Sequence, residues 1–236
     1  MIRALVVDDE VHARDELCSL LEECGNYQIL ASCANAVEAI QAIHRHRPEV
    51  LFLDIQMPVL DGFELLSMID PELMPHVVFV TAYDEFALKA FEEKTLDYLL
   101  KPVEKERLAK TTEKLKTIIQ KGTHASYDSP EVKHIPCLCG NKIKLITPKE
   151  TELVRSDLSG VHVVTAQGEF FTELTLKVLE ERTGLLRCHK QYLVNPDCLD
   201  EIILLENGLA EIHTRFGRQV PVSRRYFKGI KETLGF

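Results

Sequence analysis

Short apolar runs in the first half of the chain each end abruptly on a polar residue. Residues 4–7 run into Asp8, residues 50–53 into Asp54, and residues 77–80 into Thr81. Such short runs, without alternating polar positions, are typical of parallel strands that are buried on both faces. Residues 97–100 form a similar run before Lys101, and residues 27–33 form a weaker one.

Helical patterns separate these runs. The first has apolar residues at positions i, i+3, i+4 and i+7, beginning at Leu17, and Asn35 is placed to cap the second. Three more are predicted over residues 60–69, after Asp84 (with Phe86, Ala90 and Phe91), and around Leu108 and Leu115. Five strands alternating with five helices predict an α/β domain with a doubly wound, flavodoxin-like parallel sheet. Right-handed connections place all five strand ends at one edge, where open sheets bind their ligands.

The second half changes to short alternating runs separated by turn signals such as Gln167-Gly168 and Asn207-Gly208. Two helices are predicted, one over residues 175–182 and one that begins after Ser223. Cys137 and Cys139 offer only two metal ligands, so we interpret residues 137–139 as a strand rather than as part of a metal site.

The short alternating runs of the second half predict a mainly antiparallel β domain. Its other strands are expected at residues 142–146, 161–164, 169–171, 201–204, 209–214 and 218–222.

A linker joins the two halves. Residues 120–131 lose the apolar periodicity and are rich in small and polar side chains. We therefore expect one domain over 1–119 and a second over 132–236. The charge supports the division, since residues 1–121 account for the whole net charge of −9, whereas residues 122–236 hold 15 cations and 15 acidic residues. Such asymmetry indicates different partners for the two domains.

The composition fits a soluble globular protein, with 45% hydrophobic and 28% charged residues. No apolar stretch approaches the roughly 20 residues needed to cross a bilayer, and the N-terminus has no secretory pattern. The 7 cysteines are irregularly spaced and suggest reduced thiols rather than a disulfide framework. We expect a cytoplasmic protein that does not insert into membranes.

The strand ends of the first domain define a candidate site. The predicted edge carries Asp8, Asp9, Asp54, Thr81 and Lys101. Three carboxylates brought together repel unless a cation is present, and Mg²⁺ accepts carboxylates while sharing phosphate oxygens. The lysine and the hydroxyl would complement a phosphoryl group on the remaining carboxylate. Each residue alone is more often a helix cap or a surface charge, but their joint occurrence at successive strand ends predicts a phosphoryl acceptor.

Basic residues of the second half lie in three clusters, despite its neutral balance. They are Arg155 before Ser159-Gly160, the segment 187–190, and Arg224-Arg225 with Lys228. Solvated loops are one interpretation, because DNA-binding domains are usually net basic. However, two arginines in the first turn of a helix oppose its macrodipole, which suggests that they serve an external anion. Both interpretations remain open from the pattern alone, with nucleic-acid binding somewhat favoured.

The first domain resembles the receiver domain of two-component response regulators over about 120 residues. The resemblance rests on Asp8-Asp9, Asp54, Met57-Pro58, Gly62, Thr81-Ala82 and Lys101-Pro102. It implies that a membrane sensor histidine kinase phosphorylates Asp54, and that Mg²⁺ is held by Asp8, Asp9, Asp54 and the backbone carbonyl of Gln56. It further implies that Lys101 pairs with the phosphoryl group, Thr81 hydrogen-bonds to it, and Tyr98 is the switch aromatic. The Lys101-Pro102 peptide bond is expected to be cis, as in that family.

The second domain resembles the LytTR family of DNA-binding domains in residues 171–174, 186–195 and 220–225. That family binds DNA through loops that enter successive major grooves. By position, the resemblance implies base or groove contacts from Ser159-Gly160, Lys190 and Arg225. By charge and neighbourhood, Arg155, Arg187 and Arg224 are expected to contact phosphates. Gly160 departs from the pattern, because some members carry a side chain there that reaches a base.

These observations predict a response regulator rather than an enzyme. Phosphorylation of Asp54 would favour dimerisation through the receiver face near Tyr98 and the last receiver helix. The dimer would bind promoter DNA at repeated half-sites. A phosphatase of the aspartyl-phosphate type is one alternative, although it usually needs a second carboxylate where Gln56 stands. The other is a regulator whose second domain binds proteins and never contacts DNA.

Overall fold

The computed structural model describes residues 1–82, 96–122, 131–140, 142–205 and 209–235. The chain separates into two compact units, Met1–Pro130 and Glu131–Phe236. This division falls within the linker predicted over 120–131, whereas the bounds given above for the two domains stay predictions. The helix predicted after Asp84 and the Asn207-Gly208 turn lie outside the described residues.

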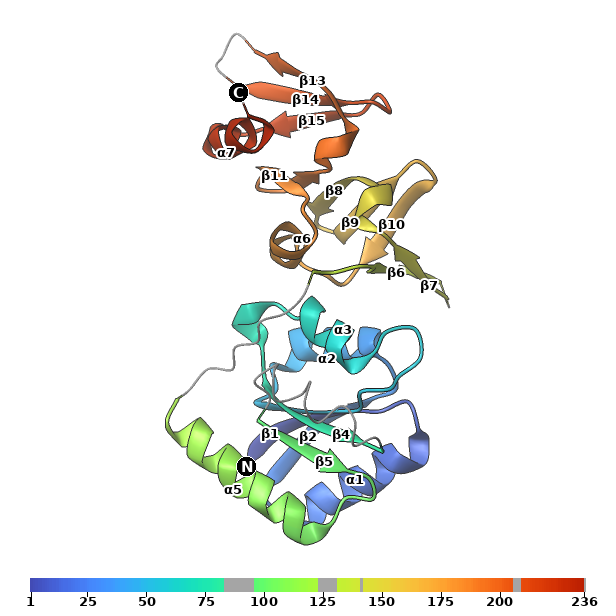
Figure 1. The fold of residues 1–236 in the computed structure, drawn as a ribbon, viewed down its shortest axis with the longest axis vertical. Helices are drawn as coiled ribbons and strands as arrows, with labels where there is room; N and C mark the ends of the chain where they lie inside the picture. The colour runs from blue at the N-terminus through green and yellow to red at the C-terminus, as the bar shows by residue number, and fades with distance from the viewer. Residues whose placement is uncertain (83–95, 123–130, 141, 206–208, 236) are drawn as a thin grey trace. The chain divides into compact units, whose positions relative to one another are not determined.

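The first unit contains the predicted parallel sheet (Figure 1). Its strand order is β2-β1-β3-β4-β5, and every neighbouring pair is parallel. The strands are β1 (Ile2–Val7), β2 (Tyr27–Cys33), β3 (Val50–Leu53), β4 (His76–Thr81) and β5 (Asp97–Leu100). All four residues of β3 are fully buried, as expected for a central strand covered on both faces.

Helices cover both faces of this sheet, with α2 and α3 on one and α1 and α5 on the other (Figure 1). They are α1 (Val11–Glu23), α2 (Ala36–His46), α3 (Gly62–Met68) and α5 (Lys105–Gln120), with a 3-10 turn η1 (Pro71–Leu73). Asn35 caps α2 as predicted, since its side chain accepts from the backbone N–H of Glu38. Helix α3 begins later than predicted, because Asp61 and Glu64 form a capping box at its start.

The second unit consists of two antiparallel sheets, in agreement with the predicted class. The larger has the order β11-β12-β8-β9-β10-β6-β7, and the smaller is β13-β14-β15. The strands are β6 (Ile135–Cys139), β7 (Lys142–Ile146), β8 (Thr151–Asp157), β9 (Gly160–Thr165), β10 (Gly168–Thr172), β11 (Leu186–His189), β12 (Tyr192–Val194), β13 (Leu199–Leu204), β14 (Ala210–Thr214) and β15 (Gln219–Val222). The helices are α6 (Leu176–Arg182) and α7 (Arg224–Leu234), with 3-10 turns η2 (Pro148–Glu150) and η3 (Pro196–Cys198).

Three strands of this unit, β8, β11 and β12, were not predicted. Polar residues such as Glu152 and Arg155 interrupt the apolar pattern of β8, while β11 and β12 are only 4 and 3 residues long. Their pairing with one another makes them strands: β12 lies between β8 and β11. Such short runs carry too little local signal to be recognised alone.

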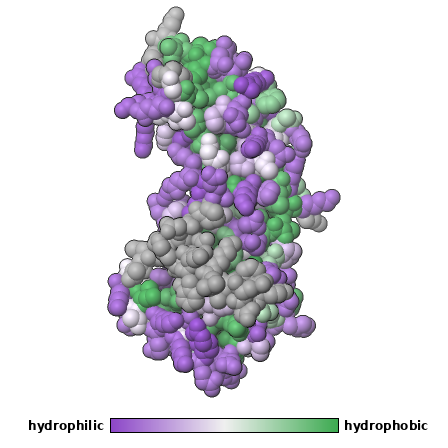
Figure 2. Space-filling model, viewed as in Figure 1, coloured by the Kyte–Doolittle hydropathy of each residue, from purple (hydrophilic) through white to green (hydrophobic). Residues whose placement is uncertain are grey.

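The surface of the second unit includes apolar side chains. Figure 2 shows hydrophobic residues gathered over the three-stranded sheet, at the top of the view, among hydrophilic ones. Leu204, Leu205 and Leu209 are among the exposed leucines. In the described part of the chain, no helix is both long enough and apolar enough to span a membrane.

Candidate functional sites

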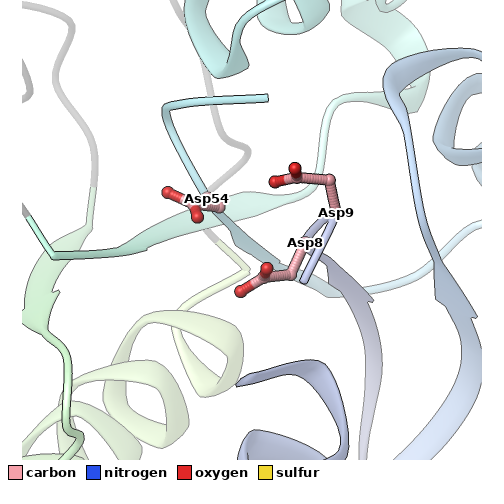
Figure 3. A group of neighbouring side chains, drawn as sticks. All are labelled: Asp8, Asp9 and Asp54. Carbon is pink, nitrogen blue, oxygen red and sulfur yellow. The ribbon is translucent and has the colours of Figure 1, made fainter. Parts of the chain in front are cut away.

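Three carboxylates meet at the carboxyl edge of the parallel sheet (Figure 3). Asp8 and Asp9 follow β1, and Asp54 follows the neighbouring strand β3. One oxygen from each carboxylate lies within 4.8 Å of the others. Asp8 is 1% exposed and Asp54 is 6% exposed. The structure therefore brings together the three acidic residues that the strand ends predicted.

The pairing of β1 with β3 explains this proximity. Val7 lies opposite Leu53, so the residues that follow, Asp8 and Asp54, emerge side by side. The backbone N–H of Asp54 donates to the carbonyl of Val7 at 2.9 Å. The N–H of Glu10 donates to Asp8 Oδ1 at 2.9 Å. Backbone hydrogen bonds thus hold both acidic residues in place before any ligand binds.

Lys101 connects two of these carboxylates. Its Nζ lies 2.7 Å from Asp8 Oδ2 and 2.7 Å from Asp54 Oδ2. Burial lowers the pKa of Lys101, but hydrogen bonds with Asp54 and Asp8 outweigh it, so its pKa is raised overall. Burial raises the pKa of Asp8, and Lys101 offsets part of that effect. The Lys101-Pro102 peptide bond is cis, as expected.

Thr81 contributes a hydroxyl at the same edge. It is the last residue of β4, it is fully buried, and its carbonyl accepts from the N–H of Lys101 at 2.9 Å. Its Oγ1 has no hydrogen-bond partner within the ranges that the structure describes. An unsatisfied buried hydroxyl costs about 1–3 kcal/mol, so a ligand oxygen that accepted from it would recover stability.

The loop after β3 approaches the site closely. A Cβ added to Gly62 would lie 2.6 Å from the carbonyl oxygen of Asp54, so only glycine fits at this position. Gln56 is exposed, and its backbone N–H reaches Asp54 Oδ1 at 3.3 Å. Tyr98, on β5, is half-buried, and its carbonyl accepts from Arg107 at 3.0 Å.

In the second unit, the predicted DNA-binding residues lie along one edge. We call it the basic edge, and it consists of Arg155, Ser159, Gly160, Arg187, Lys190, Arg224 and Arg225. Strand pairing brings two of its turns together, because the N–H of Ser156 donates to the carbonyl of Gln191 at 2.8 Å. Helix α7 begins beside them, since the N–H of Ser223 donates to the carbonyl of Cys188 at 3.0 Å. The Arg187 guanidinium lies 5.9 Å from the ring of Tyr226 on α7.

Several side chains of the basic edge also hold partners within the protein. Arg155 forms ion pairs with Asp157 and Glu169. Arg187 donates to the carbonyl of His189 at 2.8 Å and to that of Lys190 at 2.7 Å. Arg187 therefore shapes the turn that carries Lys190. Lys190, Arg224 and Arg225 are exposed.

Ser159 and Gly160 form part of the turn between β8 and β9. Ser159 Oγ donates to Asp157 Oδ1 at 2.5 Å and lies 2.8 Å from His162 Nε2. Gly160 has a φ of +119°, and a Cβ there would lie 2.5 Å from the Phe171 ring. The positive φ and the packing against Phe171 thus explain the glycine at this position. The partners Asp157, His162 and Glu169 were missed. The shape of the turn brings Asp157 and His162 to Ser159, and the register of β8, β9 and β10 brings Glu169 to Arg155.

Fold and site together define a class, the response regulators. Two protein families match the sequence: the "Response regulator receiver domain" at residues 4–113 and the "LytTr DNA-binding domain" at residues 141–235. Relatives that are about 50% identical in sequence align over the full chain. The chain therefore belongs to the response regulators that combine a receiver domain with a LytTR DNA-binding domain, a family of transcriptional regulators.

Among the relatives is the transcriptional regulatory protein BtsR of Escherichia coli (strain K12). It is 50% identical over 238 residues, covering 100% of both chains. An uncharacterized response regulatory protein of Vibrio cholerae is 54% identical over 236 residues, again covering 100% of both. The crystal structure of the response regulatory domain of protein mrkE from Klebsiella pneumoniae is 30% identical, with a TM-score of 0.46. It covers 51% of this chain and 99% of that one. The predicted resemblance to both families is confirmed.

Proposed function

We propose that Asp54 accepts a phosphoryl group from a sensor histidine kinase and that the second unit then binds promoter DNA. The observation that carries the first part is the convergence of Asp8, Asp9, Asp54 and Lys101 at the sheet edge that also holds the Thr81 hydroxyl, which has no partner among the described residues. Both activities would take place in the cytoplasm, where bacterial promoter DNA lies.

Asp54 is the best placed of the three carboxylates to act as the nucleophile. Asp8 has both oxygens engaged, one by the N–H of Glu10 and the other by Lys101. Asp54 shares Lys101 but has only a long contact, 3.3 Å, to its other oxygen. In the proposed transfer, an Asp54 oxygen forms a bond to phosphorus while the bond from phosphorus to the donor's imidazole nitrogen breaks. Lys101 would compensate the added negative charge, and Thr81 Oγ1 would donate to a phosphoryl oxygen.

The acidic cluster fits a magnesium ion. Asp8, Asp9 and Asp54 offer hard oxygen ligands within 4.8 Å of one another, which is the ligand type that Mg²⁺ prefers. We propose that these three carboxylates and the backbone carbonyl of Gln56 hold it. When bound, the ion would neutralise charge on the phosphoryl oxygens.

A switch would follow phosphorylation. We infer that Thr81 moves toward the phosphoryl group and that Tyr98 then moves inward. The backbone of Tyr98 is already held by Asp97 and Arg107, so the proposed movement is confined to its side chain. The half-buried position of Tyr98 supports this role, because the ring is neither fully enclosed nor fully solvated.

Acetyl phosphate tests the acceptor. The purified protein, incubated with acetyl phosphate and Mg²⁺, is expected to gain one phosphoryl group by intact mass, and Asp54→Asn is expected to gain none. Asp61→Asn is the matched control, because asparagine also caps a helix and Asp61 lies outside the acidic cluster. Equal labelling of the wild type and Asp54→Asn would refute the proposal.

The basic edge supports the proposed DNA binding. It presents cations from three segments of the chain, and DNA is recognised first through its phosphates. Ser159-Gly160, Lys190 and Arg225 are proposed as base or groove contacts, and Arg155, Arg187 and Arg224 as phosphate contacts. A guanidinium has five N–H donors, so Arg155 and Arg187 retain donors beyond their partners within the protein.

Mobility shifts across a salt series test DNA binding. Affinity is expected to fall steeply as salt rises, and Arg225→Ala is expected to weaken binding about tenfold or more. Lys142→Ala is the control, since it removes an exposed cation on β7, at the opposite edge of the larger sheet. Binding that ignores salt, or is unchanged in Arg225→Ala, would count against a DNA-binding second unit.

A further inference from the structure

The turn between β8 and β9 exposes a leucine completely. Leu158 has a relative exposure of 108%, the highest among the large apolar residues in the described part of the chain. It lies between Asp157 and Ser159, both of them exposed polar residues. Single exposed apolar residues are common on protein surfaces, so it is the position of Leu158, in a turn of the basic edge, that suggests a role for it.

The turn that carries Leu158 is held in a fixed shape. The N–H of Ser159 donates to Asp157 Oδ1 at 2.7 Å, and Arg155 forms an ion pair with the same carboxylate group. On the other side, Gly160 packs against the ring of Phe171. Leu158 is therefore presented by a rigid loop, and a ligand that binds it loses little free energy in ordering the chain.

The groups around Leu158 limit the kind of ligand that it can contact. Leu158 belongs to the turn that lies beside the one carrying Lys190, so it projects from the basic edge. It cannot contact a phosphate favourably. The Ser159 hydroxyl is engaged by Asp157 and His162, and Gly160 has no side chain. In the major groove, the apolar group on a base edge is the C5-methyl of thymine.

We propose that Leu158 reads thymine C5-methyl groups in the major groove. The proposal rests on the proposed DNA binding and adds a specificity-determining residue to it. Burial of one methyl group against leucine corresponds to about a fourfold change in Kd. Leu158 thus contributes sequence preference, while the surrounding cations contribute affinity that is independent of sequence.

A double-mutant cycle, with one change in the protein and one in the DNA, tests the proposed role of Leu158. The full chain first selects duplexes from a randomised library, and each thymine of the selected site is then replaced by deoxyuridine, which lacks only the methyl group. Fluorescence anisotropy is expected to show about a fourfold loss for the wild type at one or more thymines. Leu158→Ala is expected to bind the unmodified site about fourfold more weakly and to ignore the same replacements.

Phe216→Ala serves as the matched control. Phe216 is also an exposed apolar residue, at 59%, but it lies in the turn before β15, at the far end of that strand from Ser223 and α7. It is expected to keep the wild-type response to deoxyuridine.

The outcomes separate the two proposals. If the wild type binds selected DNA but no thymine methyl matters, or if Leu158→Ala responds as the wild type does, the role of Leu158 is overturned while DNA binding stands. If the library yields no bound duplex, DNA binding fails, and the role of Leu158 fails with it.

Discussion

At the scale of single residues, the acceptor site is shaped by close approach. Gly62 begins α3 directly against the carbonyl of Asp54, and its N–H donates to the carbonyl of Ile55 at 2.8 Å. A larger residue would push the loop away from the strand end that carries Asp54. At the same edge, the Thr81 hydroxyl has no partner among the described residues, which lowers stability slightly. Functional sites often retain such unfavourable features.

Gly62→Ala tests this constraint. The added Cβ would meet Asp54 O at 2.6 Å, so the receiver unit is expected to lose about 2 kcal/mol of unfolding free energy. Labelling by acetyl phosphate should fall as well, because the acceptor moves. Urea unfolding measures the first effect. Gly25→Asn is the control: Gly25 has a φ of +66° with open space around it, and asparagine tolerates that conformation, so little change is expected.

At the scale of elements, one carboxylate attaches α5 to β5. Asp97, the first residue of β5, accepts from Arg107 Nη1 at 2.9 Å and from Thr111 Oγ1 at 2.7 Å, both on α5. Burial alone would raise the pKa of Asp97, but these bonds, with others from Tyr98 N–H and Lys114, lower it to about 2. Tyr98, the proposed switch residue, follows directly, so the attachment also positions it.

The stability that Asp97 provides depends on pH. Its folded pKa lies below its unfolded value, so its contribution is complete above about pH 4 and is lost as the pH falls through about 2. Asp97→Asn is expected to lower the unfolding free energy by about 2 kcal/mol at pH 7, with the difference shrinking in acid. Glu113→Gln, which breaks an exposed pair with Lys116 on the same helix, should change stability far less. Equal effects of the two changes at neutral pH would contradict this account.

A second buried carboxylate connects the two sheets of the second unit. Glu152, on β8, is 1% exposed and accepts from Thr214 Oγ1 at 2.5 Å and from Arg218 Nε at 3.0 Å. Thr214 ends β14, in the smaller sheet. The Arg218 side chain is about half exposed, so the two partners differ in their access to water.

Because Glu152 is buried and Arg218 is half exposed, substitutions of the two residues are expected to lower the unfolding free energy by different amounts. Arg218→Met is expected to cost about 3 kcal/mol, because it leaves a buried carboxylate without its cation. Glu152→Gln should cost less, about 1–2 kcal/mol, because Arg218 can then turn to solvent. Thermal unfolding of the second unit compares them, with Arg225→Met as a control for loss of an exposed arginine. A larger loss for Glu152→Gln would show that the carboxylate is not the group that needs a partner.

At the scale of the whole molecule, the net charge differs between the two halves of the chain. The first 121 residues carry the net charge of −9, and the remainder is balanced. The net charge of the chain as a whole does not favour attraction to DNA, so the proposed DNA binding depends on the local charge of the basic edge. Dimerisation through the receiver units would add affinity without adding a new DNA contact.

Phosphorylation is therefore expected to raise DNA affinity only where the DNA carries two half-sites, one for each subunit of the dimer. With acetyl phosphate and Mg²⁺, affinity for DNA with two half-sites should rise about 100-fold, whereas affinity for a single half-site should change little. Anisotropy on both duplexes measures the difference. Asp54→Asn should show no gain on either. An equal gain on the single half-site would mean that phosphorylation alters the DNA-binding surface itself.

The parallel sheet could be predicted because its buried strands are contiguous apolar runs, with the acidic, lysine and threonine residues at their ends. The second unit was harder. Strands β8, β11 and β12 carry residues such as Arg155 and Arg187 inside them, so they resemble charged loops until their pairing is known. The ion pair between Arg155 and Glu169 depends on strand register, which no local pattern contains.

The sequence by itself determined the parallel sheet, the membership of the acidic cluster and the division of charge. It could do so because a strand buried on both faces must be apolar throughout, and the right-handed connections place every strand end at one edge. Only the tertiary structure decided that Lys101 bridges Asp8 and Asp54, that Gly160 packs against Phe171, and that Leu158 projects alone from its turn. Those facts depend on distances between segments far apart in the chain, which arise only when strand register and packing are complete.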